Sequence, residues 1–266
     1  MTDSTPAATP ESVLTLRELA VSFGGNHVLR SVDLEVPTGF TGLVGPNGAG
    51  KTTVFNVVSG YVRAAGGDVR LGGETLIGVA PDAIARRGVG RTFQTPKLVA
   101  GISVVENVML GLDGRAGPLA HLRAIAGSRR DSRPARERSL DLLERFGIVE
   151  YANEEASALP LATQKIVEVA RALIASPRLV LLDEPAAGLG AEDVEAMVAP
   201  LVELAADNDL AVVIIEHDLA LVSRLCPRLA VLHQGGVIAL GTPAEVLAQP
   251  EVVDAYLGAG FAAVGP

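Results

Sequence analysis

Alternation of apolar and polar residues marks the beginning of the chain. Residues 13–36 (VLTLRELAVSFGGNHVLRSVDLEV) alternate on both sides of Gly24-Gly25-Asn26. A side-chain period of two that is interrupted by a Gly-rich turn predicts two antiparallel strands. We therefore expect an antiparallel β subdomain at the N-terminus.

The second half of the chain has a different pattern. Three short, fully apolar runs follow one another, and each comes after a stretch with the apolar spacing of a helix. The apolar runs are 179–182, 211–215 and 229–232, and the helical stretches are 166–175, 192–204 and 219–225. Short apolar strands that alternate with helices are typical of a parallel sheet covered on both faces. The pattern predicts an α/β fold with a parallel-sheet core.

The middle of the chain is more helical. After a short strand at 69–71 and a helix at 81–87, the spacing predicts helices at 104–112 and 139–146. We expect a helical subdomain over about 95–164.

Composition and charge limit the possible partners. The 266 residues have a net charge of −9, an aromatic content of 3 % and no Trp. An acidic field and few stacking side chains disfavour nucleic-acid binding. The single cysteine, Cys226, excludes an intrachain disulfide, and no apolar stretch approaches the roughly 18 residues of a membrane span. We expect a cytoplasmic protein with a short disordered tail at 1–12, and any membrane role would come through a partner.

Residues 45–53 (GPNGAGKTT) fit the phosphate-loop pattern GxxxxGK[ST]. The apolar runs at 40–44 and 54–58 place this loop between a buried strand and a helix, which is the context the motif requires. Glycines let consecutive N–H groups surround a phosphate; Lys51 would reach the β- and γ-phosphates, and the Thr52 hydroxyl would ligate Mg²⁺. The residues expected to bind ATP here are Gly45, Pro46, Asn47, Gly48, Ala49, Gly50, Lys51, Thr52 and Thr53.

Two acids, Asp183 and Glu184, follow the apolar run at 179–182. Phosphoryl transfer needs a carboxylate that holds Mg²⁺ and a group that polarises the attacking water. The end of a strand in such a sheet places both acids where ligands bind. Without the phosphate loop, the same pair would equally fit a solvated acidic turn.

Three more residues are candidates for the site. Gln94 ends the run GRTFQ, His217 follows the predicted strand at 211–215, and Phe23 could stack on an adenine. Their alternatives are a surface glutamine, a capping histidine and a packing aromatic.

The candidates occur along the chain in the order Phe23, phosphate loop, Gln94, Asp183-Glu184 and His217. In this order they resemble the motifs of ATP-binding-cassette (ABC) ATPases, over about residues 12–258. The resemblance implies a P-loop NTPase fold over 13–258, followed by a short tail at 259–266. It also implies that Phe23 stacks on adenine, and that Gln94 senses Mg²⁺ and contacts a transmembrane partner.

The remaining implied roles concern hydrolysis. Asp183 matches the Walker B aspartate that holds Mg²⁺, Glu184 the catalytic glutamate, and His217 the switch histidine. ATP and Mg²⁺ are the implied cofactors. Lys51, Glu184 and His217 are therefore the catalytic candidates, and Thr52, Gln94 and Asp183 are the candidates for Mg²⁺.

The segments VGPNGAGKTTVFNVVSG, GVGRTFQ, LLDEPAAGL and IIEHD look like those of branched-chain amino acid importer ATPases. Such a protein works with transmembrane permease subunits, a second ATPase subunit and, indirectly, a solute-binding protein, on the inner face of the membrane. One alternative is a lipopolysaccharide-export ATPase of the same family. The other is a non-transport ABC ATPase, although this chain has neither two cassettes nor a long coiled-coil insert.

Two further expectations concern the interfaces of such an ATPase. The family's signature motif, LSGGQ, aligns with Leu159-Pro160-Leu161-Ala162-Thr163, in which only the leucine is kept. Since Pro160 offers neither a hydroxyl nor an N–H group, we expect a weakened signature and a different ATPase as partner. The alternative is variation within the subfamily that leaves the motif functional. The apolar stretch 95–112 is expected to receive a permease helix, with Val104 and Val108 exposed in the groove; the alternative is that these two valines belong to the core.

Overall fold

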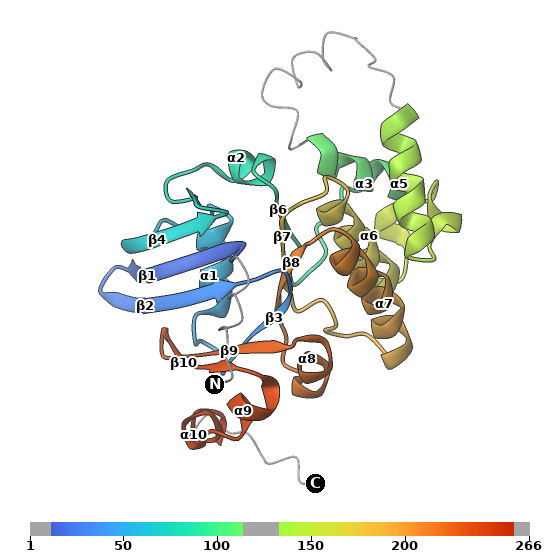
Figure 1. Ribbon diagram of the computed structural model, residues 1–266. Coiled ribbons are helices and arrows are strands. Elements are labelled where there is room, and N and C mark those ends of the chain that lie inside the picture. The colour runs from blue at the N-terminus through green and yellow to red at the C-terminus, as the bar shows by residue number, and fades with distance from the viewer. Residues whose placement is uncertain (1–11, 114–132, 258–266) are drawn as a thin grey trace, which may run out of the picture.

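The computed structural model describes residues 12–113 and 133–257 (Figure 1). The tails expected at 1–12 and 259–266 lie outside the described residues, apart from Ser12. The strands are β1 (Leu14–Phe23), β2 (Asn26–Val36), β3 (Gly39–Val44), β4 (Gly66–Leu71), β5 (Glu74–Thr75), β6 (Val89–Arg91), β7 (Leu179–Asp183), β8 (Ala211–Ile215), β9 (Arg228–His233) and β10 (Gly236–Gly241).

These strands form one sheet that changes character across its width. The strand order is β5-β4-β1-β2-β10-β9-β3-β8-β7-β6. β1 pairs antiparallel with β2 and β4, whereas β3, β6, β7, β8 and β9 are linked by parallel pairings. The structure therefore confirms the predicted α/β fold, with its parallel core and its N-terminal antiparallel subdomain.

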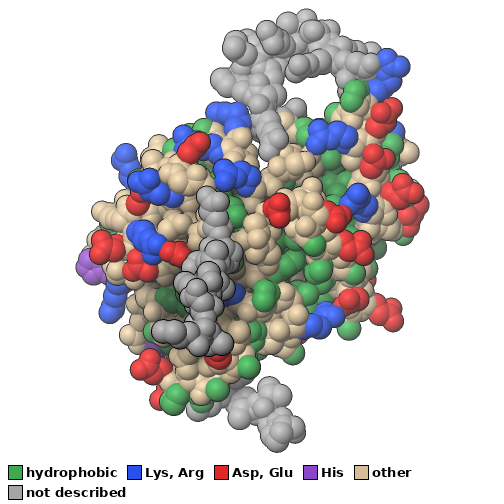
Figure 2. All heavy atoms as spheres, in the orientation of Figure 1, with side chains coloured by type: hydrophobic (Ala, Val, Ile, Leu, Met, Phe, Trp, Pro, Cys, Tyr) green, Lys and Arg blue, Asp and Glu red, His purple; other side chains and the backbone are tan. Residues whose placement is uncertain are grey.

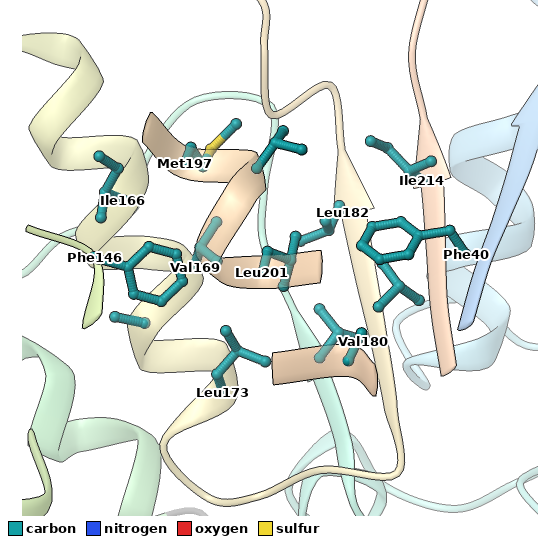
Figure 3. Packing of buried hydrophobic residues seen from close by; sticks show 14 of the residues in the cluster. Phe40, Phe146, Ile166, Val169, Leu173, Val180, Leu182, Met197, Leu201 and Ile214 are labelled. Atoms are coloured by element: carbon teal, nitrogen blue, oxygen red, sulfur yellow. The ribbon is translucent and has the colours of Figure 1, made fainter. Parts of the chain in front are cut away.

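Helices cover both faces of the parallel core, with α1 on one face and α6 and α7 on the other. The described helices are α1 (Lys51–Val58), α2 (Pro81–Arg86), α3 (Val104–Asp113), α5 (Arg133–Arg145), α6 (Leu161–Leu173), α7 (Ala191–Asp207), α8 (Leu219–Leu225), α9 (Pro243–Leu247) and α10 (Pro250–Leu257). The side chains of β7 are divided between two hydrophobic cores, one on each face of the sheet. Val180 and Leu182 pack with α6 and α7 (Figure 3), while Leu179 and Leu181 pack with α1 and the antiparallel strands. Because successive side chains of a strand point to opposite faces, a fully apolar strand is buried on both.

The interpretation of Val104 and Val108 as exposed groove residues is wrong. Both are fully buried in the core that α3 forms with α5 and α6. Their spacing of four residues places them on one face of the helix, and this apolar face is the one turned inward. α3 packs closely: a Cβ on Gly111 would stand 2.1 Å from the carbonyl oxygen of Arg171 in α6.

The surface carries both signs of charge. Figure 2 shows Lys and Arg side chains mainly over the antiparallel strands and α2, and acidic side chains mainly along the side formed by α5 and α7. Within the described residues, no helix combines the length and apolar character required to cross a membrane.

Candidate functional site

The phosphate loop is shaped by its backbone. The φ angles are 146° at Gly45, 78° at Gly48 and 107° at Gly50, a backbone region that residues other than glycine rarely adopt. At Gly45 there is also no room, since an added Cβ would stand 2.0 Å from the carbonyl oxygen of Leu232. α1 begins directly after the loop, and no side chain caps its first N–H groups. These groups are therefore available to an anion.

Lys51 lies folded back on the loop that precedes it. Its Nζ donates to the carbonyl oxygens of Gly45 at 2.6 Å and Pro46 at 3.0 Å. Burial lowers the pKa of Lys51, and the nearby carboxylates of Glu184 and Asp183 oppose that shift. The ammonium carries three hydrogens, so it can keep both carbonyl partners and still donate to a phosphate oxygen.

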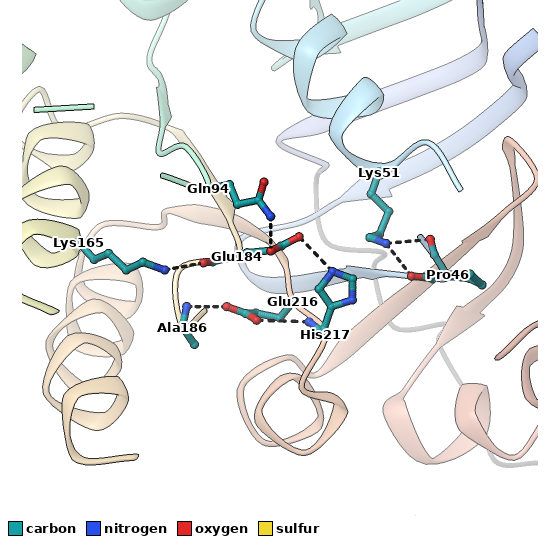
Figure 4. A network of polar contacts seen from close by, with 9 residues as sticks. Pro46, Lys51, Gln94, Lys165, Glu184, Ala186, Glu216 and His217 are labelled. Atoms are coloured by element: carbon teal, nitrogen blue, oxygen red, sulfur yellow. Dashed lines mark hydrogen bonds and ion pairs between the residues drawn. The ribbon is translucent and has the colours of Figure 1, made fainter. Parts of the chain in front are cut away.

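Glu184 is held between two of the predicted site residues (Figure 4). Its Oε2 accepts a hydrogen bond from Gln94 Nε2 at 2.7 Å, and its Oε1 lies 3.0 Å from His217 Nε2. The three residues come from the ends of β7 and β8 and from the loop after β6. Glu184 itself has a φ of 50°, the left-handed conformation that costs about 1–3 kcal/mol for such a residue unless its surroundings enforce it.

Asp183 precedes Glu184 but lies in a different environment. It is buried, and its carboxylate faces the guanidinium of Arg91 at 3.5 Å. Burial raises the pKa of Asp183, and Arg91 opposes the shift. Arg91 is itself surrounded by the rings of Phe55, Tyr61 and Phe93. The carboxylate is therefore fixed in position.

A cavity of about 240 Å³ joins the two sides of the site. It is lined by Val28, Asn47, Gly48, Ala49, Gly50, Lys51, Thr52, Thr53, Glu184 and His217. Thus the structure brings most of the phosphate loop together with two candidates that are more than 130 residues away in sequence. Gln94 reaches this cavity through Glu184. Phe23 does not line it, and stands 53 % exposed at the end of β1.

The donor set fits a magnesium ion that arrives with a nucleotide. Across residues 12–113 and 133–257, no group of three or more His, Cys, Asp and Glu could hold a metal by itself. Mg²⁺ commonly takes one or two protein oxygens and completes its shell with phosphates and water. Thr52 and Asp183 offer such a pair, and Gln94 offers a further amide oxygen.

Sequence reasoning missed the residues that hold these groups in place. Lys165 and Glu168 in α6 are buried although charged, and Glu216 directly before His217 is buried as well. Glu168 accepts from the backbone N–H groups of Phe93 at 3.3 Å and Lys97 at 3.1 Å, on either side of Gln94. For Lys165 and Glu168 the sequence does contain one signal of burial, because both are charged residues on the apolar face of a helix.

The altered signature segment lies at the start of α6. Pro160 is the N-cap residue of this helix, and no side chain caps the N-terminus there. Leu161 stands 44 % exposed. The segment therefore presents apolar surface where the family motif presents a serine and glycines.

Comparisons with known proteins agree with this geometry. The profile of the ABC transporter family matches residues 29–187, and that of the branched-chain amino acid ATP-binding cassette transporter matches residues 237–262.

Curated relatives match over nearly their whole length. The high-affinity branched-chain amino acid transport ATP-binding protein BraF of Pseudomonas aeruginosa is 37 % identical over 249 residues, which cover 92 % of this chain and 98 % of the relative. The corresponding protein LivG of Escherichia coli is 37 % identical over 251 residues, with 93 % and 98 % covered. The lipopolysaccharide export system ATP-binding protein LptB of Escherichia coli is 34 % identical over 251 residues, with 94 % and 99 % covered.

Solved structures agree as well. A nucleotide-free ATP-binding cassette from an ABC transporter superposes with a TM-score of 0.82 at 28 % identity, covering 92 % of this chain and 99 % of that one. The ADP conformation of an ATP-binding cassette of an ABC transporter gives a TM-score of 0.82 at 29 % identity, covering 93 % of this chain and 99 % of that one. The chain therefore belongs to the ABC transporter family, as one of its ATP-binding ATPase subunits.

Proposed function

We propose that this chain is the ATP-hydrolysing subunit of an ABC importer for branched-chain amino acids or related small solutes. The observation that carries the proposal is the placement of Glu184 between Gln94 and His217, across the cavity from the phosphate loop. The match of residues 237–262 to the branched-chain amino acid profile supports the solute class.

In this proposal, Glu184 accepts the proton of the attacking water, and His217 holds the carboxylate on its other side. Lys51 and the N–H groups of the phosphate loop bind the triphosphate. Thr52 and Asp183 would hold Mg²⁺, with Gln94 offering its amide oxygen, and the ion would supply positive charge to the phosphates. Phe23 contacts the adenine from the end of β1.

The partners follow from the same assignment. Permease subunits dock beside Gln94, where Tyr61 and Val99 stand 60 % and 46 % exposed. Exposed apolar side chains beside a functional residue are what such an interface requires. A solute-binding protein acts through the permease, and the chain is held on the inner face of the membrane by these subunits.

We also propose that the second ATPase subunit is a different chain. Each ATP site of such a pair combines the phosphate loop of one subunit with the signature of the other. This chain contributes an intact phosphate loop but an altered signature at Pro160 and Ala162. Slow hydrolysis by the purified chain and fast hydrolysis in the hetero-complex are expected; fast hydrolysis by the chain alone would contradict the asymmetry.

Transport measurements test the main proposal. The chain is co-expressed with neighbouring permease and ATPase genes, and the complex is reconstituted into vesicles with the solute-binding protein. We expect ATP-dependent uptake of labelled leucine, isoleucine or valine. ATP hydrolysis that moves a lipid or lipopolysaccharide instead would favour the export alternative, which the 34 % identity to LptB supports.

A further inference from the structure

Lys165 is a buried lysine whose partners are backbone carbonyl groups. Its Nζ donates to the carbonyl oxygens of Glu184 at 3.0 Å, Pro185 at 3.0 Å and Ala187 at 2.7 Å. The residue is only 5 % exposed, on the face of α6 that is turned toward the end of β7 (Figure 4). All three hydrogens of the ammonium are thus used on one short loop.

The loop that Lys165 holds begins at Glu184. Residue 184 is where the chain leaves β7 with a φ of 50°. A left-handed residue that is not glycine persists only when its neighbours fix it, and such residues concentrate at functional sites. Three bonds from a single buried cation are a direct means of fixing this one.

The donors of the same loop are held from the opposite side. The N–H group of Glu184 donates to the carbonyl oxygen of Ile215 at 2.9 Å. The N–H group of Ala186 donates to the carboxylate of Glu216 at 2.6 Å. The end of β8 and the residue after it therefore hold two N–H groups of the loop, while Lys165 holds carbonyl groups of the same loop. The carbonyl oxygen of Glu184 also accepts from the N–H group of Ala187 at 3.2 Å.

Nearby carboxylates offset part of the cost of burying the charge of Lys165. Burial lowers the pKa of Lys165, and the carboxylates of Glu216, Glu168 and Glu184 oppose the shift. A neutral side chain at this position would leave the three carbonyl oxygens without the donor that they have here, which costs more than removing both partners of a bond.

We propose that Lys165 is a positioning residue for ATP hydrolysis, which sets the direction of the Glu184 carboxylate by holding the carbonyl groups of residues 184, 185 and 187. It acts through Glu184 and makes no contact with the nucleotide. The inference rests on the proposed role of Glu184. It also gives α6, the helix that begins within the altered signature segment, a task in the ATP site of its own subunit.

The test compares turnover and nucleotide binding in Lys165→Met, measured in the full-length chain within the complex that it forms. Misplacement of a reacting group by about 1 Å costs up to about a hundredfold in rate, so we expect kcat to fall roughly ten- to a hundredfold. The KM for ATP should stay within about twofold, because the phosphate loop is untouched. Lys165→Arg, which can still donate to carbonyl groups, should recover most of the loss.

Arg138→Met is the matched control. Arg138 also donates to a backbone carbonyl group, that of Ile174 at 3.1 Å, but far from Glu184 in the chain. The Arg138→Met substitution removes a bond of similar kind, and it should lower kcat by less than about twofold. Melting curves of all variants separate loss of fold from loss of rate, and if Lys165→Met does not fold, Lys165→Gln takes its place.

A double variant distinguishes this proposal from a general structural role. In the Glu184→Gln background, Lys165→Met should cause no further loss of single-turnover rate, because its effect requires Glu184. An additive loss, an unchanged kcat in Lys165→Met, or a rise in KM alone would overturn the inference. Normal turnover in Glu184→Gln would instead overturn the proposed role of Glu184.

Discussion

The two walls of the ATP site are built in different ways. One, the phosphate-loop wall (residues 45–53), takes its shape from glycine backbone geometry and the start of α1. The other, the carboxylate wall (Gln94, Glu184 and His217), takes its shape from side chains that bond to one another and to a loop backbone across long stretches of sequence.

This difference decides how each wall responds to change. A wall made of backbone N–H groups keeps most of its binding capacity when one side chain is removed. A wall made of a few side chains loses its geometry when one of their anchors is lost. We therefore expect the phosphate-loop wall to govern affinity and the carboxylate wall to govern rate.

The largest effect should come from Glu184→Gln. Glutamine keeps the size of the side chain but cannot accept a proton from water, so turnover should fall by roughly a hundredfold or more, as expected for a lost base. ATP affinity should stay near that of the wild type, since the phosphate-loop wall is intact. Single-turnover hydrolysis and equilibrium binding of ATP measure the two quantities, and turnover above a tenth of the wild-type rate would contradict the assignment.

Lys51→Ala tests the other wall. Hydrogen bonds to charged groups contribute about 1.5–3 kcal/mol, so ATP affinity should fall roughly ten- to a hundredfold and still be measurable. Titration calorimetry provides the measurement. If binding disappears altogether or is unchanged, the backbone does not make the contribution that the comparison assigns to it.

Gly45→Ala should damage the same wall through its backbone. The added Cβ meets the carbonyl oxygen of Leu232, and the φ of 146° is unfavourable for alanine, so we expect a loss of about 1–3 kcal/mol in unfolding free energy and weaker ATP binding. Gly25→Ala is the control, because no atom lies within 4 Å of its added Cβ. Denaturant unfolding of both variants measures the loss of stability. Equal unfolding midpoints for Gly45→Ala and Gly25→Ala would contradict the prediction.

The smallest effect is expected for Glu168→Gln. The amide can accept only one of the two N–H groups of Phe93 and Lys97, so the loop around Gln94 loosens and hydrolysis should fall three- to tenfold, about 1 kcal/mol. Glu155→Gln is the matched control, since this exposed side chain accepts from the N–H group of Gly101 at 2.9 Å, away from the site. Steady-state ATPase rates should separate the two; equal rates would remove Glu168 from the support of Gln94.

The sequence predicts the two walls unequally well. The strand, loop and helix around Lys51 are contiguous, so periodicity and the glycine spacing predict both the elements and their contact. The existence of β7, β8 and β9 as parallel strands follows similarly from alternating apolar strands and helices, whereas the position of β3 between β9 and β8 was not predicted.

Long-range contacts explain what the sequence does not predict. Val104 and Val108 have the same apolar pattern whether α3 faces a partner or α5 and α6, and only packing decides between these faces. β10 and α9 were not predicted from the pattern; α9 begins with a capping box formed by Thr242 and Glu245. Their position on the apolar face of α6 could indicate that Lys165 and Glu168 are buried, but their bonding partners lie in loops that are distant in sequence, so their tasks were not predictable from local spacing.

The scarcity of lysine has a practical consequence for chemical labelling. Of the three lysines, Lys51 and Lys165 are buried with their amines bonded to carbonyl groups, whereas Lys97 is exposed beside Phe93, with its Nζ 5.7 Å from the ring centroid. An amine-reactive fluorophore at low stoichiometry should therefore modify one lysine side chain of the folded protein. That dye would sit beside Gln94, where it could report the arrival of a permease in real time.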